Sequence, residues 1–138
     1  MEELDRKMAE KVMGWEYFVC GYFGTEEETE RMRELEMWMD RNHLDSVGTY
    51  YIKQGVNFWM PAIEWLPSTD IRQAIQIAER MRKRFDYGLV FISRVTMHPT
   101  FYAQFRKVLS VWGGGEGEGY SNNPAEVICL AAANTLGV

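Results

Sequence analysis

The sequence predicts an α+β fold, an α/β/α sandwich in which a small antiparallel sheet is covered by helices. Segments near the beginning, the middle and the end of the chain have apolar residues at helical spacing. Between the last two of these lie two segments of strand composition joined by a short loop, which is the pattern of an antiparallel hairpin. Helices and strands that segregate along the chain in this way favour α+β over a parallel α/β sheet.

The size of the chain suits one hydrophobic core. It has 138 residues, of which 46% are hydrophobic and 14% are aromatic. A globular composition at this length predicts one folded domain. We therefore expect a single domain over residues 1–138, in which residues 16–48 form a helical insertion.

The first helix is predicted over Glu2–Met13. Leu4, Met8 and Val12 recur at every fourth position, and Gly14 follows directly after the segment. This spacing puts the three apolar side chains on one face of a helix, and the glycine is typical of a helix end.

A second, acidic helix is predicted inside the insertion, from Thr25 to about Asp40. Thr25 and Glu28 have the spacing of a capping box, and much of the helix surface is charged. One face carries an apolar stripe made of Met32, Leu35, Trp38 and Met39. Because an exposed stripe of this kind usually packs against a partner, we expect a homo-oligomer.

Residues 49–59 have strand composition with imperfect alternation. Tyr50–Ile52 and Val56–Trp59 are separated by Gly55. This pattern predicts either two short strands or one strand followed by a loop.

The middle helix is predicted to begin after a cap at Ser68 or Thr69 and to end near Phe85. Its apolar positions follow helical spacing and are Ile71, Ala74, Ile75, Ala78 and Met81. Two strands are then predicted over Leu89–Val95 and Phe101–Arg106, joined by a hairpin loop at Met97–Thr100.

The end of the chain combines a glycine-rich segment with a helix whose limits are encoded locally. Gly113–Gly119 predicts a flexible connection. Asn123 can cap the helix that follows, Pro124 fits its first turn, and Gly137 can end it in the left-handed conformation.

The distribution of charge limits the partners that the sequence favours. The net charge is −5, with −8 over residues 1–70 and +3 over residues 71–138. An acidic chain lacks the continuous basic surface that general binding to nucleic acid needs, so we expect no nucleic-acid partner. The basic second half is the part that can attract a small anion.

Membrane and secretion signals are not expected either. No apolar run approaches the roughly 18 residues of a membrane span, and the segment Met1–Asp5 is acidic rather than basic. Cys20 and Cys129 have no metal or redox spacing, so reduced thiols and a cytoplasmic location are expected.

The sequence carries no recognisable catalytic or metal-binding motif. His43 and His98 lack a second ligand at the usual spacing, which predicts that no metal is bound. There is no nucleophile elbow, and the glycine-rich segment lacks the Lys-Ser/Thr step of a phosphate-binding loop. We therefore expect a protein without enzymatic activity and without a cofactor.

The predicted hairpin offers the candidate ligand-binding residues. Tyr102, Gln104 and Arg106 share one face of a strand by alternation, and Arg94 lies on the neighbouring strand. An aromatic ring, an amide and a guanidinium together can stack on a base and hold a phosphate. The same alternation is also what an ordinary solvated sheet face shows. Further stacking surface can come from Trp59, Trp65 and Tyr120.

Three short segments resemble a known family. They are Trp65–Ile71, Pro124–Ala133 and the opening Ala9–Trp15. Taken in the order in which they occur along the chain, they resemble the phage ABA sandwich domain, and the resemblance covers most of the chain apart from residues 16–48. The resemblance implies a small protein encoded by a phage or prophage, with a sheet between helical layers, and it implies no catalytic residues.

Two functions are compatible with these features. The first is a phage-encoded binding protein that sequesters a small anionic ligand in the host cytosol, such as a cyclic or ADP-ribose-type nucleotide used by the bacterium as an immune signal. The alternative is a protein-interaction module that docks the acidic helix of residues 26–40 on a basic host protein.

Overall fold

The computed structural model describes residues 2–19, 30, 33, 49–53, 58–107 and 117–138. They fall into two compact units, one formed by residues 1–13 with 66–138 and the other by residues 14–65. The α+β class is confirmed, and its strands form two antiparallel sheets of three strands each. The acidic helix and the apolar stripe expected between residues 25 and 40 lie almost wholly outside the described residues.

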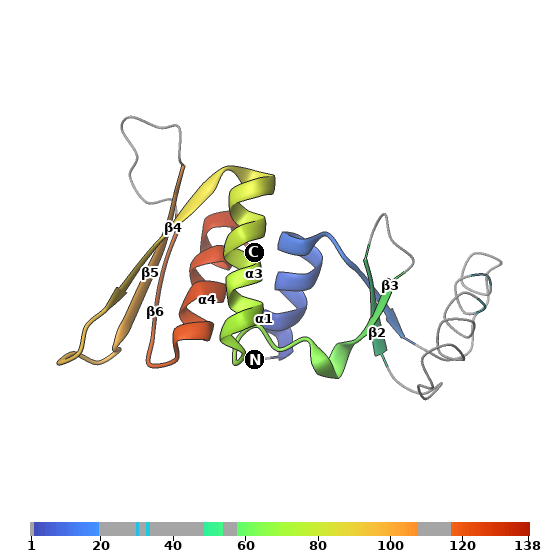
Figure 1. The fold of residues 1–138 in the computed structure, drawn as a ribbon, viewed down its shortest axis with the longest axis horizontal. Coiled ribbons are helices and arrows are strands. Elements are labelled where there is room, and N and C mark those ends of the chain that lie inside the picture. The colour runs from blue at the N-terminus through green and yellow to red at the C-terminus, as the bar shows by residue number, and fades with distance from the viewer. Residues whose placement is uncertain (1, 20–29, 31–32, 34–48, 54–57, 108–116) are drawn as a thin grey trace. The chain divides into compact units, whose positions relative to one another are not determined.

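The larger unit packs helices against one face of a sheet (Figure 1). Its elements are the helix α1 (Glu2–Lys7) with the π-helical segment η1 (Met8–Met13), the helix α3 (Ile71–Phe85), the strands β4 (Tyr87–Ser93), β5 (Phe101–Lys107) and β6 (Gly117–Ser121), and the helix α4 (Pro124–Leu136). The helix α4 contacts β5, β6, α3 and α1. A helix in that position must be apolar on most of its surface, and seven of its residues are buried.

The helix predicted over residues 2–13 is present, with π-helical hydrogen bonding in its second half. Met8, Ala9 and Val12 are buried. At its end, Arg84 Nη1 donates to the Val12 carbonyl oxygen at 3.1 Å, which satisfies one of the carbonyl groups that a helix terminus leaves unpaired.

The helix α3 ends at Phe85 as predicted, but its cap is Asp70 rather than Ser68 or Thr69, so it begins one or two residues later than predicted. The Asp70 carboxylate accepts from the backbone N–H groups of Arg72 and Gln73. Ser68 is instead buried, and its backbone N–H donates to Asp5 Oδ1 at 2.8 Å. This bond fixes α1 to the chain that leads into α3.

The buried side of α3 is rotated from the predicted one. Ala74, Ile77 and Met81 are fully buried, whereas Ile71 and Ile75 are exposed by 42% and 49%. Helical spacing predicted an apolar face, but the neighbours of the helix decide which part of that face is covered.

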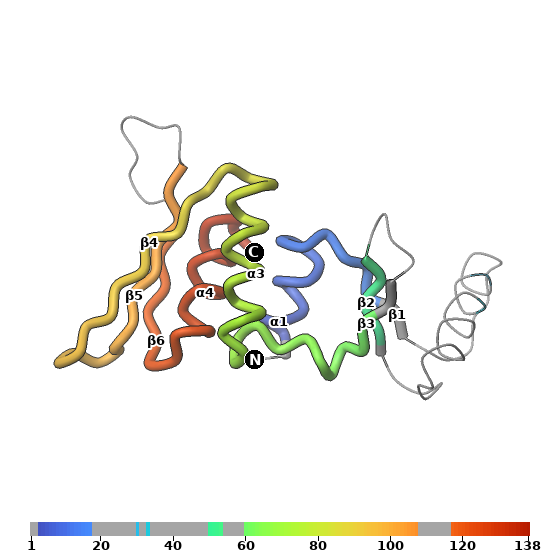
Figure 2. The backbone as a smooth tube through the Cα atoms, in the orientation of Figure 1, coloured from blue at the N-terminus to red at the C-terminus, as the bar shows by residue number. Residues whose placement is uncertain are grey.

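The sheet of the larger unit has the order β4-β5-β6 (Figure 2). Its first two strands form the predicted hairpin, with Val90 opposite Gln104 and Ile92 opposite Tyr102. The loop that joins them is held at one end by the Arg94 backbone N–H, which donates to the Thr100 carbonyl oxygen at 2.6 Å.

The prediction of a flexible connection over Gly113–Gly119 is wrong for its last residues. Gly117–Ser121 is the strand β6, and residues 113–116 lie outside the described residues. The strand lies so close to α4 that a Cβ atom at Gly119 would fall 2.7 Å from the Val127 carbonyl oxygen. Glycine is used here because the helix approaches the strand backbone closely.

The smaller unit has a sheet in the order β1-β2-β3, made of Glu16–Val19, Thr49–Lys53 and Phe58–Pro61, followed by the short 3-10 helix η2 (Ala62–Glu64). Two strands within residues 49–61 are thus confirmed, while β1 was not predicted. Trp15 packs edge-on against Trp65 at 4.5 Å and lies 6.2 Å from the ring of Tyr51. Lys53 Nζ lies 4.7 Å from the Trp15 ring, and partial burial lowers the pKa of its ammonium.

Candidate functional site

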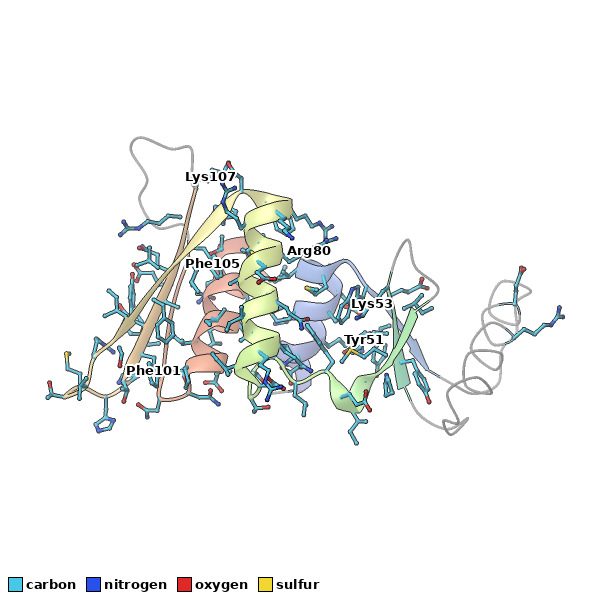
Figure 3. The ribbon with its side chains drawn as sticks, viewed as in Figure 1. Tyr51, Lys53, Arg80, Phe101, Phe105 and Lys107 are labelled. Atoms are coloured by element: carbon cyan, nitrogen blue, oxygen red, sulfur yellow. The ribbon has the colours of Figure 1, made fainter. Side chains whose placement is uncertain are left out.

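The face of the β4-β5-β6 sheet opposite α4 gathers polar and aromatic side chains. Residues 103, 105, 117, 119 and 121 are buried, and in Figure 3 Phe105 lies between its strand and the helices. Because side chains alternate along a strand, the residues between these point to the other face. We call this surface the tyrosine–arginine face after its polar and aromatic residues, which are Arg94, Tyr102, Gln104, Arg106, Glu118 and Tyr120; Val90 and Ile92 of β4 lie on the same side of the sheet.

One end of the face is aromatic. Tyr102 and Tyr120 are directly opposite each other on β5 and β6, with ring centroids 5.0 Å apart and planes tilted by 54°. The Arg94 guanidinium lies over the Tyr120 ring, with Cζ 5.1 Å from the centroid, and Nη2 donates to the Pro99 carbonyl oxygen. Tyr120 is 48% exposed, so much of its ring surface remains accessible for stacking.

The other end of the face is a chain of hydrogen bonds. Arg106 Nε donates to Gln104 Oε1 at 2.7 Å, and Gln104 Nε2 donates to Glu118 Oε1 at 3.3 Å. Gln104 is only 5% exposed, so its amide orients the two charged groups from below. The Arg106 side chain is exposed, and the bond through Nε leaves its Nη groups able to contact a phosphate.

The electrostatics of the face favour an anion weakly. It carries two guanidinium groups and one carboxylate. Partial burial and then the hydrogen bond and charge of Glu118 raise the pKa of the Tyr102 phenol. This phenol is therefore neutral at physiological pH and adds no negative charge to the surface.

The structure brings together most of the side chains that the sequence indicated, namely Arg94, Tyr102, Gln104, Arg106 and Tyr120. The two candidate tryptophans, Trp59 and Trp65, belong to the smaller unit. Trp65 is buried, at 1% exposure, and Trp59 lies on β3 with its side chain outside the described residues.

Glu118 is the residue of the face that sequence reasoning missed. It lies between Gly117 and Gly119, in the glycine-rich segment for which the sequence predicts a flexible connection. The alternation Gly117, Glu118, Gly119, Tyr120 and Ser121, with every second residue small, was the signal that could have identified a strand packed closely against a helix.

Other kinds of site find no support in the described part of the chain. In the described residues there is no group of three or more His, Cys, Asp or Glu side chains placed to hold a metal ion. None of the described helices is both long enough and apolar enough to span a bilayer.

Comparison of the chain with models of protein families, with curated proteins and with solved structures finds no match. The likeness to the phage ABA sandwich domain therefore remains a prediction from the short segments that suggested it.

Proposed function

We propose that this protein binds a small anionic ligand with an aromatic ring, such as a nucleotide, on the tyrosine–arginine face and releases it unaltered. The proposal rests on one arrangement of side chains. The rings of Tyr102 and Tyr120 lie beside each other, the Arg94 guanidinium lies over Tyr120, and Arg106 lies on the same face of the sheet. Aromatic rings stack on a base, and a guanidinium pairs with a phosphate through two parallel hydrogen bonds.

The biological role that fits such binding is sequestration. A phage that removes a cyclic or ADP-ribose-type nucleotide from the host cytosol would silence the immune response that the nucleotide triggers. The resemblance to a phage domain supports this role. Sequestration needs affinity and no chemistry, in keeping with a sequence that carries no catalytic motif.

The test is calorimetric titration of the protein with a panel of cyclic dinucleotides and ADP-ribose-type nucleotides, followed by recovery of the ligand. We expect one class to bind and to be recovered intact. Arg106→Ala should weaken binding by roughly ten- to a hundredfold, because a hydrogen bond to a charged group contributes about 1.5–3 kcal/mol. Tyr102→Phe should change the affinity little, since the ring remains.

The control is Arg80→Ala, which removes the same charge from an exposed position of α3 (Figure 3). It should leave the affinity unchanged. Equal losses in both variants would mean that net charge alone attracts the ligand. An unchanged affinity in Arg106→Ala, or recovery of a modified nucleotide, would exclude the proposal.

A further inference from the structure

The strand β4 forms an edge of its sheet that nothing in its sequence protects. It pairs with β5 on one side, and none of the described strands pairs with the other. The strand reads Tyr-Gly-Leu-Val-Phe-Ile-Ser, without a charged residue or a proline, and its register with β5 is continuous. Edge strands normally carry lysine, proline or a bulge, because an unprotected edge pairs with another chain.

The exposure of the β4 side chains also indicates that this edge lacks a neighbouring strand in the described part of the chain. None of its residues is buried, whereas the middle of β5 is. Phe91 and Ile92 are exposed by 40% and 46%, and by alternation they lie on opposite faces of the sheet. The other edge strand, β6, differs in having an exposed charged residue, Glu118, at its second position. Apolar side chains on both faces are typical of a strand in the interior of a sheet, and β4 has them although it lies at an edge.

The hydrogen-bonding groups at the free edge can be assigned. The Arg94 N–H donates toward β5, and in an antiparallel pair successive residues point their backbone groups to opposite sides. Residues 88, 90 and 92 therefore face β5. Residues 87, 89, 91 and 93 present their N–H and C=O groups to the free edge.

We propose that two copies of the chain pair through β4 in antiparallel orientation, with Val90 of one copy opposite Val90 of the other, to form a six-stranded sheet. In this register Leu89 lies opposite Phe91, and Tyr87 lies opposite Ser93. All the outward backbone groups of both strands are then paired, which no other register of the same two strands achieves.

Charge at the ends of the strand supports a second copy of this chain as the partner. Asp86 precedes β4 and Arg94 follows it, at equal distances along the chain from Val90. The symmetric pairing therefore sets residue 86 of each copy opposite residue 94 of the other. Within one copy the Asp86 carboxylate pairs with Arg82 and the Arg94 guanidinium lies over Tyr120, so the facing charges act from the ends of the ladder without forming a direct ion pair. Opposite charges at facing positions stabilise a strand pair, and like charges destabilise it.

This pairing has a consequence for the tyrosine–arginine face, although it does not depend on the proposed function. Residues opposite each other in an antiparallel pair point to the same side of the sheet. The two copies of the face would then form one continuous surface. A ligand with two phosphates or two bases could contact both halves.

Disulfide formation tests the register directly. In a Cys20→Ser background, Val90→Cys places two thiols across the symmetry axis, where Cα atoms of a pair without mutual hydrogen bonds lie about 4.5 Å apart. This distance permits a disulfide. We expect mild oxidation to convert most of the Val90→Cys protein to a covalent dimer. Ile92→Cys is more exposed but should stay monomeric on denaturing gels, because its thiols would be four residues apart along the strands, about 13 Å.

Light scattering at micromolar concentration provides the second measurement. The unmodified protein should have the mass of a dimer, and Val90→Lys should halve that mass because two ammonium groups would face each other. Val95→Lys, at a loop position that is 87% exposed and beyond the ladder, should remain dimeric. A monomeric wild-type protein, or a dimer in which Val90→Cys and Ile92→Cys cross-link equally, would overturn the proposal. If Val90→Lys does not fold, the cross-linking result decides.

Discussion

Replacing Gly119 with alanine tests whether the close approach of β6 to α4 holds the sheet in place. The added Cβ would lie 2.7 Å from the Val127 carbonyl oxygen, 2.9 Å from the Ala131 nitrogen and 3.1 Å from the Leu130 Cβ. The two nearest atoms belong to the helix backbone, so no side-chain rotation can relieve the contact. The strand and the helix must move apart.

The expected cost is at the upper end of the range for overpacked cores. Inserting a methyl group into a well-packed site costs about 1–3 kcal/mol, and a contact with backbone relaxes least. We expect the free energy of unfolding to fall by about 3 kcal/mol. For a chain of this size that lowers the melting temperature by about 10 °C. Urea and thermal unfolding followed by circular dichroism at 222 nm measure both quantities.

Glu118→Ala is the matched control, because it changes the neighbouring residue of the same strand on the opposite face. It should alter the free energy of unfolding by less than about 1 kcal/mol, as surface substitutions usually do. If Gly119→Ala is as stable as the wild type, or if both variants lose the same stability, close packing between β6 and α4 is not what requires a glycine.

Two further predictions concern charge. Burial, with smaller contributions from Asp5 and Glu126, raises the pKa of the Cys129 thiol. The folded protein therefore keeps this proton when the unfolded chain loses it, above about pH 8.5. The advantage in unfolding free energy of the wild type over Cys129→Ala should shrink by about 1.4 kcal/mol per pH unit above that point, and a constant difference in urea titrations at pH 8, 9 and 10 would contradict it. Glu118→Gln should tighten binding of an anionic nucleotide about two- to fivefold in calorimetry, since a repulsive charge near the surface is worth up to about 1 kcal/mol. Weaker binding would instead mean that the carboxylate contacts the ligand.

Local chemistry in the sequence was enough to place the last helix. The Asn123 carboxamide oxygen accepts from the backbone N–H groups of Ala125 and Glu126, Pro124 occupies the first turn, and Gly137 has a φ of 70°. These interactions join residues at most a few positions apart. For the same reason the alternation in Phe101–Arg106 was sufficient to place Tyr102, Gln104 and Arg106 on one face.

The tertiary structure decided the features that depend on distant residues. Glycines at 117 and 119 predict a loop by intrinsic preference, and only the position of α4 makes them part of a strand. Ile71 and Ile75 fit the helical pattern as well as Ile77 does, but the packing of α3 covers Ile77 alone. Likewise, the sequence could not reveal that Trp65 is enclosed beside Trp15.

The candidate site shows both contributions. Strand periodicity determined which side chains of β5 share a face, because that depends only on neighbouring residues. The pairing of β5 with β6 determined that Tyr120 meets Tyr102 and that Glu118 meets Gln104. Strand pairing brings together residues far apart in the sequence through backbone groups that are the same in nearly every residue. Side-chain identities along one segment therefore carry little information about its partner, and the contacts between segments were visible only in the folded chain.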